Sequence, residues 1–372
     1  ASDVYKRQEV SSLVIRSIVE DAQNYLGEEI EEAVISVPAY FHDEQRVAVK
    51  RAGALAGIHV ERIVNEPSAA ALASYFTANE EQNMLVFDFG GGTLDVSLVD
   101  CFDTMVEIVS VAGNNRLGGD DFDRLIAEHF LREHGVARQQ LRAQEYAVLL
   151  KQAERCKKLL SEQDEVVMHA TVGDQLYEST YTMDRLFEES KALLKEIRQV
   201  IGRALKDGKM TIHDVDLVVM AGGSSKMPLI QKYIRHLFHK APMVQGNCDE
   251  LIALGLGLVC GVKERKEEIK DYILTDICPF SLGVATINEA DPDRAYMANI
   301  INRNTVLPCS RVRRFYTASD QQDYVVVEVH QGENTYAQDN LLLGKIEISV
   351  PPKPKGKDCL LYTSPSPRDG LL

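Results

Sequence analysis

Short runs of alternating apolar and polar residues exchange with longer stretches of helical spacing along the first half of the chain. The expected elements, in order, are a helix over 11–27, a strand over 33–39, a helix over 43–57, a strand over 60–65 and a helix opening at Pro67. Gly27 suits the end of the first helix, and Asp43 suits the N-cap of the second. Strands and helices in alternation predict an α/β fold.

The middle of the chain carries three glycine-rich loops, each beside a predicted strand. The first lies in VFDFGGGTLDVS, residues 86–97, where three glycines separate two apolar runs. The second is GNNRLGGDDFD, residues 113–123, and the third is AGGSSKMP, residues 221–228, between a strand and a helix. Two long amphipathic helices are expected over 139–161 and 183–206, with a strand pair between them.

The pattern changes after the charged run 263–270. No long helical pattern follows, and short alternating runs instead predict an antiparallel β-domain that starts near Asp276. The boundary is expected at 271–275, although linkers are usually polar and this one has an apolar middle. The tips, residues 1–8 and 358–372, look foreign to the fold, the second because it is rich in proline and serine.

Composition narrows the class of protein. The chain has 372 residues, enough for two or three domains, and a net charge of −15, which argues against a nucleic-acid or anionic-membrane binder. No apolar stretch approaches the ~18–20 residues of a spanning helix, and we expect no signal peptide. The seven cysteines show no zinc spacing, so a reduced, cytoplasmic setting is expected.

The first glycine loop has the chemistry of a phosphate site. Glycines let a ligand approach the backbone, and consecutive N–H groups in a tight turn bind anions. Asp88 and Asp95 would repel a phosphate unless a Mg²⁺ ion and its waters lay between them, and Thr93 adds a hydroxyl donor. A plain hairpin turn is the alternative. The lysine-bearing P-loop is excluded, because no Gly-Lys-Ser/Thr follows.

Two more segments carry weaker signals. The loop 221–228 faces a helix N-terminus, which favours anions, although simple turn chemistry explains it as well. Glu154, Lys157, Lys158 and Ser161 fall on one face of a predicted helix, for which a solvated surface is the alternative.

Taken in order, five motifs resemble those of the heat shock protein 70 chaperone family, the DnaK-like branch of the actin and hexokinase ATPase fold. The motifs are VISVPAYFHDEQR, VNEPSAAALA, DFGGGTLDVS, LGGDDFD and AGGSSKMP. ILTDICPFSLGV is most similar to the HscC-type members. The resemblance runs from about Ser11 to Lys357. It implies an actin-like ATPase domain over 9–270, a linker over 271–275 and a partial antiparallel β-sandwich that binds peptides over 276–357.

The resemblance also implies ATP or ADP with Mg²⁺ as ligands and ATP hydrolysis as the reaction. Gly90, Gly91, Gly92 and Thr93 would contact the β- and γ-phosphates. Asp88 and Asp95 would hold Mg²⁺ through water, and Glu66 would position the attacking water. The other implied nucleotide contacts are Gly118, Gly119, Asp121, Glu154, Lys157, Lys158, Ser161, Gly222, Gly223, Ser224, Lys226 and Asp249.

The chain departs from the family pattern in two respects. Relatives usually carry arginines at Lys158 and Lys226, where planar guanidinium groups sandwich adenine; lysine cannot stack, so weaker nucleotide binding is expected. The family's first phosphate loop and its catalytic lysine are expected upstream of this chain. The ATPase domain is therefore expected to be incomplete, and the segment to hydrolyse ATP poorly although its parent should be active.

The remaining implied roles concern partners and signalling between domains. Pro38 and Arg46 match a signalling pair, and Leu274 belongs to a linker that docks in one nucleotide state. Arg62, Asn65 and Ser68 match part of a surface for a J-domain co-chaperone, and a nucleotide exchange factor is a further possible partner. The implied peptide-groove residues are Val284, Thr286, Ile287, Phe315, Ala318, Val325 and Val327, for which plain sandwich core is the alternative.

The leading interpretation is an ATP-dependent chaperone for unfolded or extended polypeptides, active in protein folding and the stress response, with no nucleic-acid or membrane partner. A non-catalytic fragment that binds nucleotide and peptide is the first alternative. Another ATPase of the actin fold, such as a sugar kinase, is the second, and the apolar linker and trailing β-domain argue against it.

Overall fold

The computed structural model describes residues 7–78, 80–172, 175–244, 248–266, 271–288, 291–356 and 358–362. Contacts divide the chain into two compact units: residues 66–273 form one, and residues 1–65 together with 274–372 form the other. This division differs from the linear one expected from the sequence, because the chain leaves one unit after Asn65 and returns to it at Leu274.

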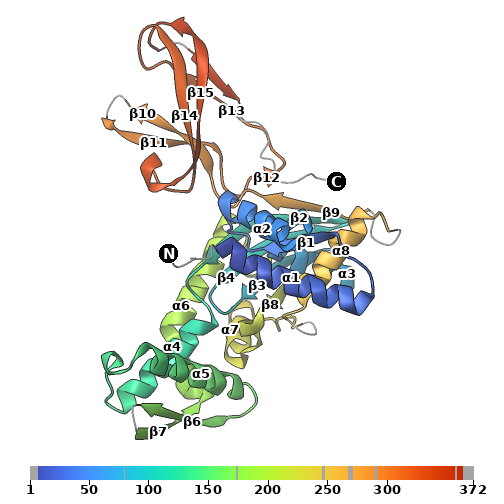
Figure 1. Ribbon diagram of the computed structural model, residues 1–372, viewed down its shortest axis with the longest axis vertical. Helices are drawn as coiled ribbons and strands as arrows, with labels where there is room; N and C mark the ends of the chain where they lie inside the picture. The colour runs from blue at the N-terminus through green and yellow to red at the C-terminus, as the bar shows by residue number, and fades with distance from the viewer. Residues whose placement is uncertain are drawn as a thin grey trace. The chain divides into compact units, whose positions relative to one another are not determined.

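A mixed sheet is the centre of the unit 66–273 (Figure 1). The strands that this unit contributes to it in full are β3 (Gln82–Phe89), β4 (Leu94–Phe102), β5 (Met105–Asn114) and β8 (Leu217–Ala221). Strands β3, β4 and β5 pair antiparallel in chain order, and β8 runs parallel to β3. Their apolar side chains are almost all buried, which explains why these strands read as continuous hydrophobic runs.

Four helices of this unit accompany the sheet. Helix α3 (Glu66–Ala78) lies against α8 (Leu251–Lys263), so closely that a Cβ atom at Gly255 would fall 1.9 Å from the carbonyl oxygen of Ala69. Helix α6 (Met183–Asp207) packs on β4 and β5 and begins at Thr182, whose hydroxyl accepts the N–H of Arg185. Helix α7 (Pro228–Phe238) follows β8 and the short 3₁₀ segment Gly223–Lys226.

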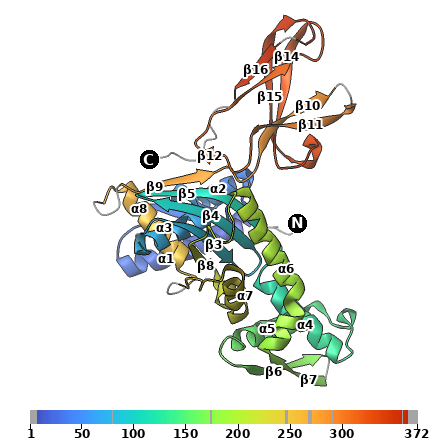
Figure 2. The ribbon, with the colours of Figure 1, turned by 180° about the vertical axis from the view of Figure 1, so that it is seen from behind.

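A smaller α/β group lies at the far end of α6, as Figures 1 and 2 both show. It contains α4 (Gly119–Glu133), α5 (Ala143–Leu159), β6 (Glu165–Val172) and β7 (Gln175–Thr182). The expected helix 139–161 is interrupted: residues Arg138–Gln140 form a 3₁₀ turn, and α5 starts at Ala143. The break arises because Arg142 caps α5, with its N–H donating to Glu145 Oε2 at 2.7 Å.

The other unit opens with α1 (Arg7–Leu26), β1 (Glu32–Val37), α2 (Asp43–Ala56) and β2 (His59–Asn65). Strands β1 and β2 pair in parallel. The expectation that Asp43 caps α2 is wrong: His42 is the N-cap, and its N–H donates to Gln45 Oε1 at 2.8 Å. Gly27 has φ of +73°, which fits its expected place at the end of α1.

The rest of this unit is antiparallel β-structure, as expected after residue 276. Its strands are β9 (Ile273–Ile277), β10 (Leu282–Asn288), β11 (Asp291–Ile301), β12 (Val306–Leu307), β13 (Val312–Tyr316), β14 (Gln322–Gln331), β15 (Leu341–Lys353) and β16 (Asp358–Tyr362), with a 3₁₀ turn at Ala337–Asp339. Four of them form the sheet β11-β10-β14-β15. Val284, Ala298 and Val327 form a small core on it.

Residues 358–362, the start of the segment expected to be a foreign tail, form β16 and pair with β13 over five pairs of residues. Strand β13 would otherwise present an open backbone edge, and β16 satisfies it. Most of the foreign-looking tips, residues 1–6 and 363–372, lie outside the described residues. Within the described part, no helix has both the length and the apolar character that crossing a bilayer requires.

Candidate functional site

The first glycine loop is the tip of the β3–β4 hairpin. Asp88 and Asp95 are direct cross-strand partners in the register of the two strands, so their carboxylates lie on the same face of the sheet. The N–H of Gly90 donates to the carbonyl of Thr93 at 3.0 Å and closes the turn. Asp95 is only 4% exposed. The fold therefore holds two carboxylates side by side immediately beneath the loop.

Glu66, the first residue of α3, joins this acidic pair. Burial, then repulsion from Asp88 and Asp95, raises the pKa of Glu66 to about 8. Burial raises the pKa of Asp88 to about 6, and burial with repulsion from Asp88 raises the pKa of Asp95 to about 7. These shifts mean that burial disfavours the ionised form of all three carboxyls, and that each carboxyl's neighbours supply no positive charge that offsets this cost.

The residues present fit a divalent cation. Oδ1 of Asp95 is buried and has no hydrogen-bond partner among the described residues, which marks an unmet demand for positive charge or bound water. The described residues contain no group of three or more His, Cys, Asp or Glu placed to bind a metal directly. The donor set therefore suits Mg²⁺, which keeps several of its waters and is bound by few carboxylates.

The second glycine loop is hydrogen-bonded to the first. The N–H of Gly119 donates to the carbonyl of Gly90 at 3.0 Å, and the N–H of Asp120 donates to that of Gly91 at 2.7 Å. A Cβ atom at Gly118 would lie 2.2 Å from the carbonyl oxygen of Gly91, so only glycine permits this approach. Asp121 accepts the N–H of Gly118 at 2.7 Å.

The third glycine loop also touches the first. Gly222 has φ of +81°, and a Cβ atom there would lie 2.7 Å from Oδ1 of Asp88. A Cβ atom at Gly119 would lie 2.2 Å from Oγ of Ser224, which brings the second and third loops together. The expected loop residues 90–93, 118–121 and 222–224 are thus neighbours in space, although more than a hundred positions separate the first from the last.

Each lysine expected near the adenosine forms an ion pair with a carboxylate. Lys157 is buried, pairs with Asp123 at 2.8 Å and donates to the carbonyl of Gly119 at 2.9 Å. The exposed ammonium of Lys158 pairs with Glu154 at 2.6 Å. Lys226 pairs with Asp249 across from Gly223, and Ser161 is exposed just past the end of α5.

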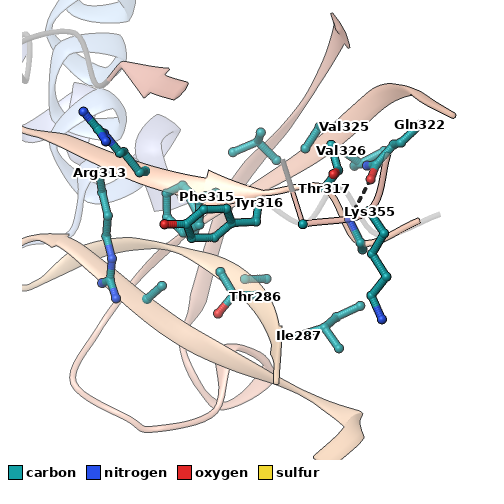
Figure 3. Close-up of a pocket in the computed structure, with 17 residues that line it drawn as sticks. Thr286, Ile287, Arg313, Phe315, Tyr316, Thr317, Gln322, Val325, Val326 and Lys355 are labelled. Atoms are coloured by element: carbon teal, nitrogen blue, oxygen red, sulfur yellow. Dashed lines mark hydrogen bonds between the residues drawn. The ribbon is translucent and has the colours of Figure 1, made fainter. Parts of the chain in front are cut away.

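A second candidate site is a groove of about 1100 Å³ in the antiparallel β-region (Figure 3). Strands β10, β13 and β14 supply most of its lining. All seven residues expected in a peptide groove line it: Val284, Thr286, Ile287, Phe315, Ala318, Val325 and Val327. Val284 and Val327 are also buried core residues, so these two residues line the groove and belong to the core of the β-sheet at the same time.

Comparison with known proteins identifies the family. A family model described as Hsp70 protein matches residues 1–364. The chain belongs to the Hsp70 family. A curated relative, the chaperone protein dnaK of Cyanophora paradoxa, is 37% identical over 375 residues, which cover 98% of this chain and 59% of the relative. The Hsp70 chain therefore spans somewhat more than half of the relative it matches.

Of the residues expected to signal between domains, Arg46 belongs to a chain of hydrogen bonds that ends close to Leu274. Arg46 donates to the carbonyl of Phe41 at 3.3 Å, which holds the turn that follows Pro38, and to Oδ1 of Asn65 at 2.5 Å. Asn65 in turn donates to Asp276, two residues after Leu274. Sequence reasoning did not single out Asp276, whose only signal was its place at the end of the apolar linker.

Two expected surface residues are buried. Asn65 is 3% exposed and Ser68 is 1% exposed, whereas Arg62 is partly exposed. Asn65 is hydrogen-bonded to Arg46 and Asp276, and Ser68 is buried within helix α3, so neither residue presents the exposed surface that was expected for a co-chaperone. Sequence reasoning also missed Asp123, the buried partner of Lys157, although it ends the LGGDDFD motif.

Proposed function

We propose that this Hsp70 chain is the nucleotide- and peptide-binding part of an ATP-dependent chaperone. One observation carries the proposal: three glycine loops close around a buried acidic pair in a chain that also forms an apolar groove lined by β-strands. The phosphate chemistry and the peptide site are supported by different residues, so each can be tested separately.

The nucleotide half of the proposal assigns a role to each loop. The N–H groups of Gly91 and Gly92 would donate to the phosphates, and Thr93 would add its hydroxyl. Asp88 and Asp95 would hold Mg²⁺ through its waters, and the ion would supply charge neutralisation for the triphosphate. Glu66, whose pKa burial and then repulsion from Asp88 and Asp95 raise to about 8, would orient the attacking water from the start of α3.

The adenosine would lie toward α5 and the third loop. Gly222, Gly223 and Ser224 bring backbone close to the ligand, while Glu154, Lys158, Ser161, Lys226 and Asp249 surround it. The stems of Lys158 and Lys226 cover an adenine ring but do not stack on it, so replacing both with arginine is expected to tighten ADP binding. Both lysines are already held by acidic neighbours, which an arginine can also engage.

The peptide half assigns the β-region groove to an extended apolar segment. Backbone hydrogen bonds would provide affinity, and pockets between Phe315, Val325 and Val327 would select side chains. Coupling between the halves would pass through Arg46, Asn65 and Asp276, close to Leu274. Leu274→Asp in the full-length protein is then expected to abolish the acceleration of peptide release by ATP.

A single experiment distinguishes the chaperone from two other functions. A non-catalytic binder would retain both ligands without turnover, and an actin-fold kinase would transfer phosphate to a small molecule. The test is a single-turnover ATP assay on this chain and on a longer version with its upstream coding segment, beside peptide binding measured by fluorescence anisotropy. Hydrolysis by the longer version together with peptide binding supports the chaperone. Failure of the intact gene product to bind ATP at millimolar Mg²⁺ would refute it.

A J-domain co-chaperone, a nucleotide exchange factor and a cytoplasmic site of action accompany this proposal. They follow from the family resemblance and from composition. Affinity capture with a purified J-domain, in the presence and absence of ATP, would test the first of these partners.

A further inference from the structure

The groove in the β-region has a charge distribution that its apolar lining does not require. Of the 17 residues that line it, three are cationic, and these are Arg313, Arg314 and Lys355. None of the 17 lining residues carries a carboxylate. The chain as a whole is strongly acidic, with a net charge of −15, so the local charge of the groove opposes the global charge.

Arg313 is held at the groove rather than pointing freely into solvent. It lies two residues before Phe315 on β13, so both side chains project from the same face of the strand. Its guanidinium lies 5.8 Å from the centroid of the Phe315 ring, and its Nη1 donates to the carbonyl of Asn299 at 2.6 Å. These contacts fix a positive charge beside an aromatic residue of the lining.

The two ends of the groove differ in charge. Figure 3 places Arg313 and Lys355 on opposite sides of Phe315 and Tyr316. Asp320 accepts the backbone N–H of Lys355 at 2.8 Å, so a carboxylate lies beside the lysine end. Within the described part of the chain, Arg313 and Arg314 form no ion pair with a carboxylate. The arginine end is therefore the more positive one.

We infer that the groove selects extended apolar segments flanked by aspartate or glutamate, with Arg313 and Arg314 as the residues that set this preference. The inference rests on the proposed peptide-binding function and adds a substrate class to it. Charges at the rim of a binding site act mainly through encounter rate and partner choice. They act within about 10 Å at ~0.1 M salt, so a bound flank senses the nearby arginines more than distant acidic residues.

The test uses three fluorescein-labelled peptides with one leucine-rich core and flanks of Glu-Glu, Ser-Ser or Lys-Lys. Binding to the chain is followed by fluorescence anisotropy at low salt and at roughly 0.5 M salt. The Glu-flanked peptide is expected to bind about three- to tenfold more tightly than the Ser-flanked one, and the Lys-flanked peptide more weakly. The differences are expected to shrink at high salt.

Arg313→Gln combined with Arg314→Gln is expected to remove most of the preference for the Glu-flanked over the Ser-flanked peptide. Arg311→Gln is the matched control, because Arg311 is exposed on the same segment but does not line the groove. A thermal melt of each variant establishes that it is folded, and Arg314→Gln alone serves if the double variant is not.

The outcomes separate the two proposals. Equal binding of the three peptides, tighter binding of the Lys-flanked peptide, or an unchanged preference in the double arginine variant would overturn the inference and leave the chaperone function standing. Failure of all three peptides to bind would instead overturn the proposed peptide-binding function, and this inference with it.

Discussion

Replacing Asp95 with asparagine should remove the part of the pH dependence of stability that this buried carboxyl imposes on the protein. Asp95 is 4% exposed, its Oδ1 lacks a hydrogen-bond partner among the described residues, and burial with repulsion from Asp88 raises its pKa to about 7. Asparagine has nearly the same shape but cannot ionise. The substitution therefore removes the buried charge without creating a large cavity.

The sign of the effect follows from proton binding. Because its pKa is higher in the folded state than in the unfolded state, Asp95 keeps its proton on folding over the interval between the two values. The folded protein then binds more protons than the unfolded chain, and the free energy of unfolding falls as pH rises. The loss begins near the unfolded pKa of about 4 and is complete above the folded pKa of about 7.

The magnitude can be worked from the same shift. Between pH 5 and pH 7 the carboxyl is ionised in the unfolded chain and protonated in the folded protein, so the free energy of unfolding falls by about 1.4 kcal/mol per pH unit, and above pH 7 the fall levels off. The ion-free wild-type protein should lose about 2–3 kcal/mol of stability over this interval through Asp95 alone. An amide that leaves one buried group unpaired costs about 1–3 kcal/mol at every pH, so Asp95→Asn starts less stable and ends near or above the wild type.

Urea denaturation at pH 5, 6, 7 and 8 without Mg²⁺ or nucleotide measures this difference. Asp120→Asn is the matched control, since it removes an exposed carboxylate from the second glycine loop. Saturating Mg²⁺ and ATP should restore wild-type stability at pH 8 and affect Asp95→Asn much less. Parallel pH profiles for the wild type and Asp95→Asn would refute the view that this site stores uncompensated negative charge for a cation.

Three further predictions concern other parts of the two sites. Lys157→Met should lower the free energy of unfolding, measured by urea denaturation, by about 3 kcal/mol, because it leaves Asp123 buried and unpaired. Adding Asp123→Leu should recover most of this loss. Equal losses in the single and double variants would contradict a stabilising ion pair between Lys157 and Asp123. Gly118→Ala should destabilise the protein by about 1–3 kcal/mol and weaken nucleotide binding, because the added Cβ clashes with the first loop. Gly202→Ala in α6 meets nothing within 4 Å and should raise the free energy of unfolding by up to about 1 kcal/mol. Equal melting temperatures for the two variants would count against close contact between the loops. Ile287→Asp, at a lining position that is 67% exposed, should weaken peptide binding about tenfold in the anisotropy assay and change stability by no more than about 0.5 kcal/mol, and unchanged affinity would place the peptide elsewhere.

The sequence by itself determined the local parts of this protein. The alternation of strands and helices, the β3–β4 hairpin with its glycine tip, and the antiparallel character after residue 276 could all be read from periodicity and turn residues. The family could be recognised because its motifs are short, local and ordered. Asp88 and Asp95 could be placed side by side because a hairpin fixes its own register.

Tertiary structure alone decided which distant groups meet. That Gly118 touches Gly91, that Lys157 neutralises Asp123, and that Asn65 is buried between Arg46 and Asp276 depend on packing between segments far apart in the chain. Helix ends were also decided by side-chain capping that the pattern does not specify, as at His42 and Arg142. Local pattern records the conformation of each segment, whereas burial, pKa and the charge of a groove depend on the neighbours that folding brings together.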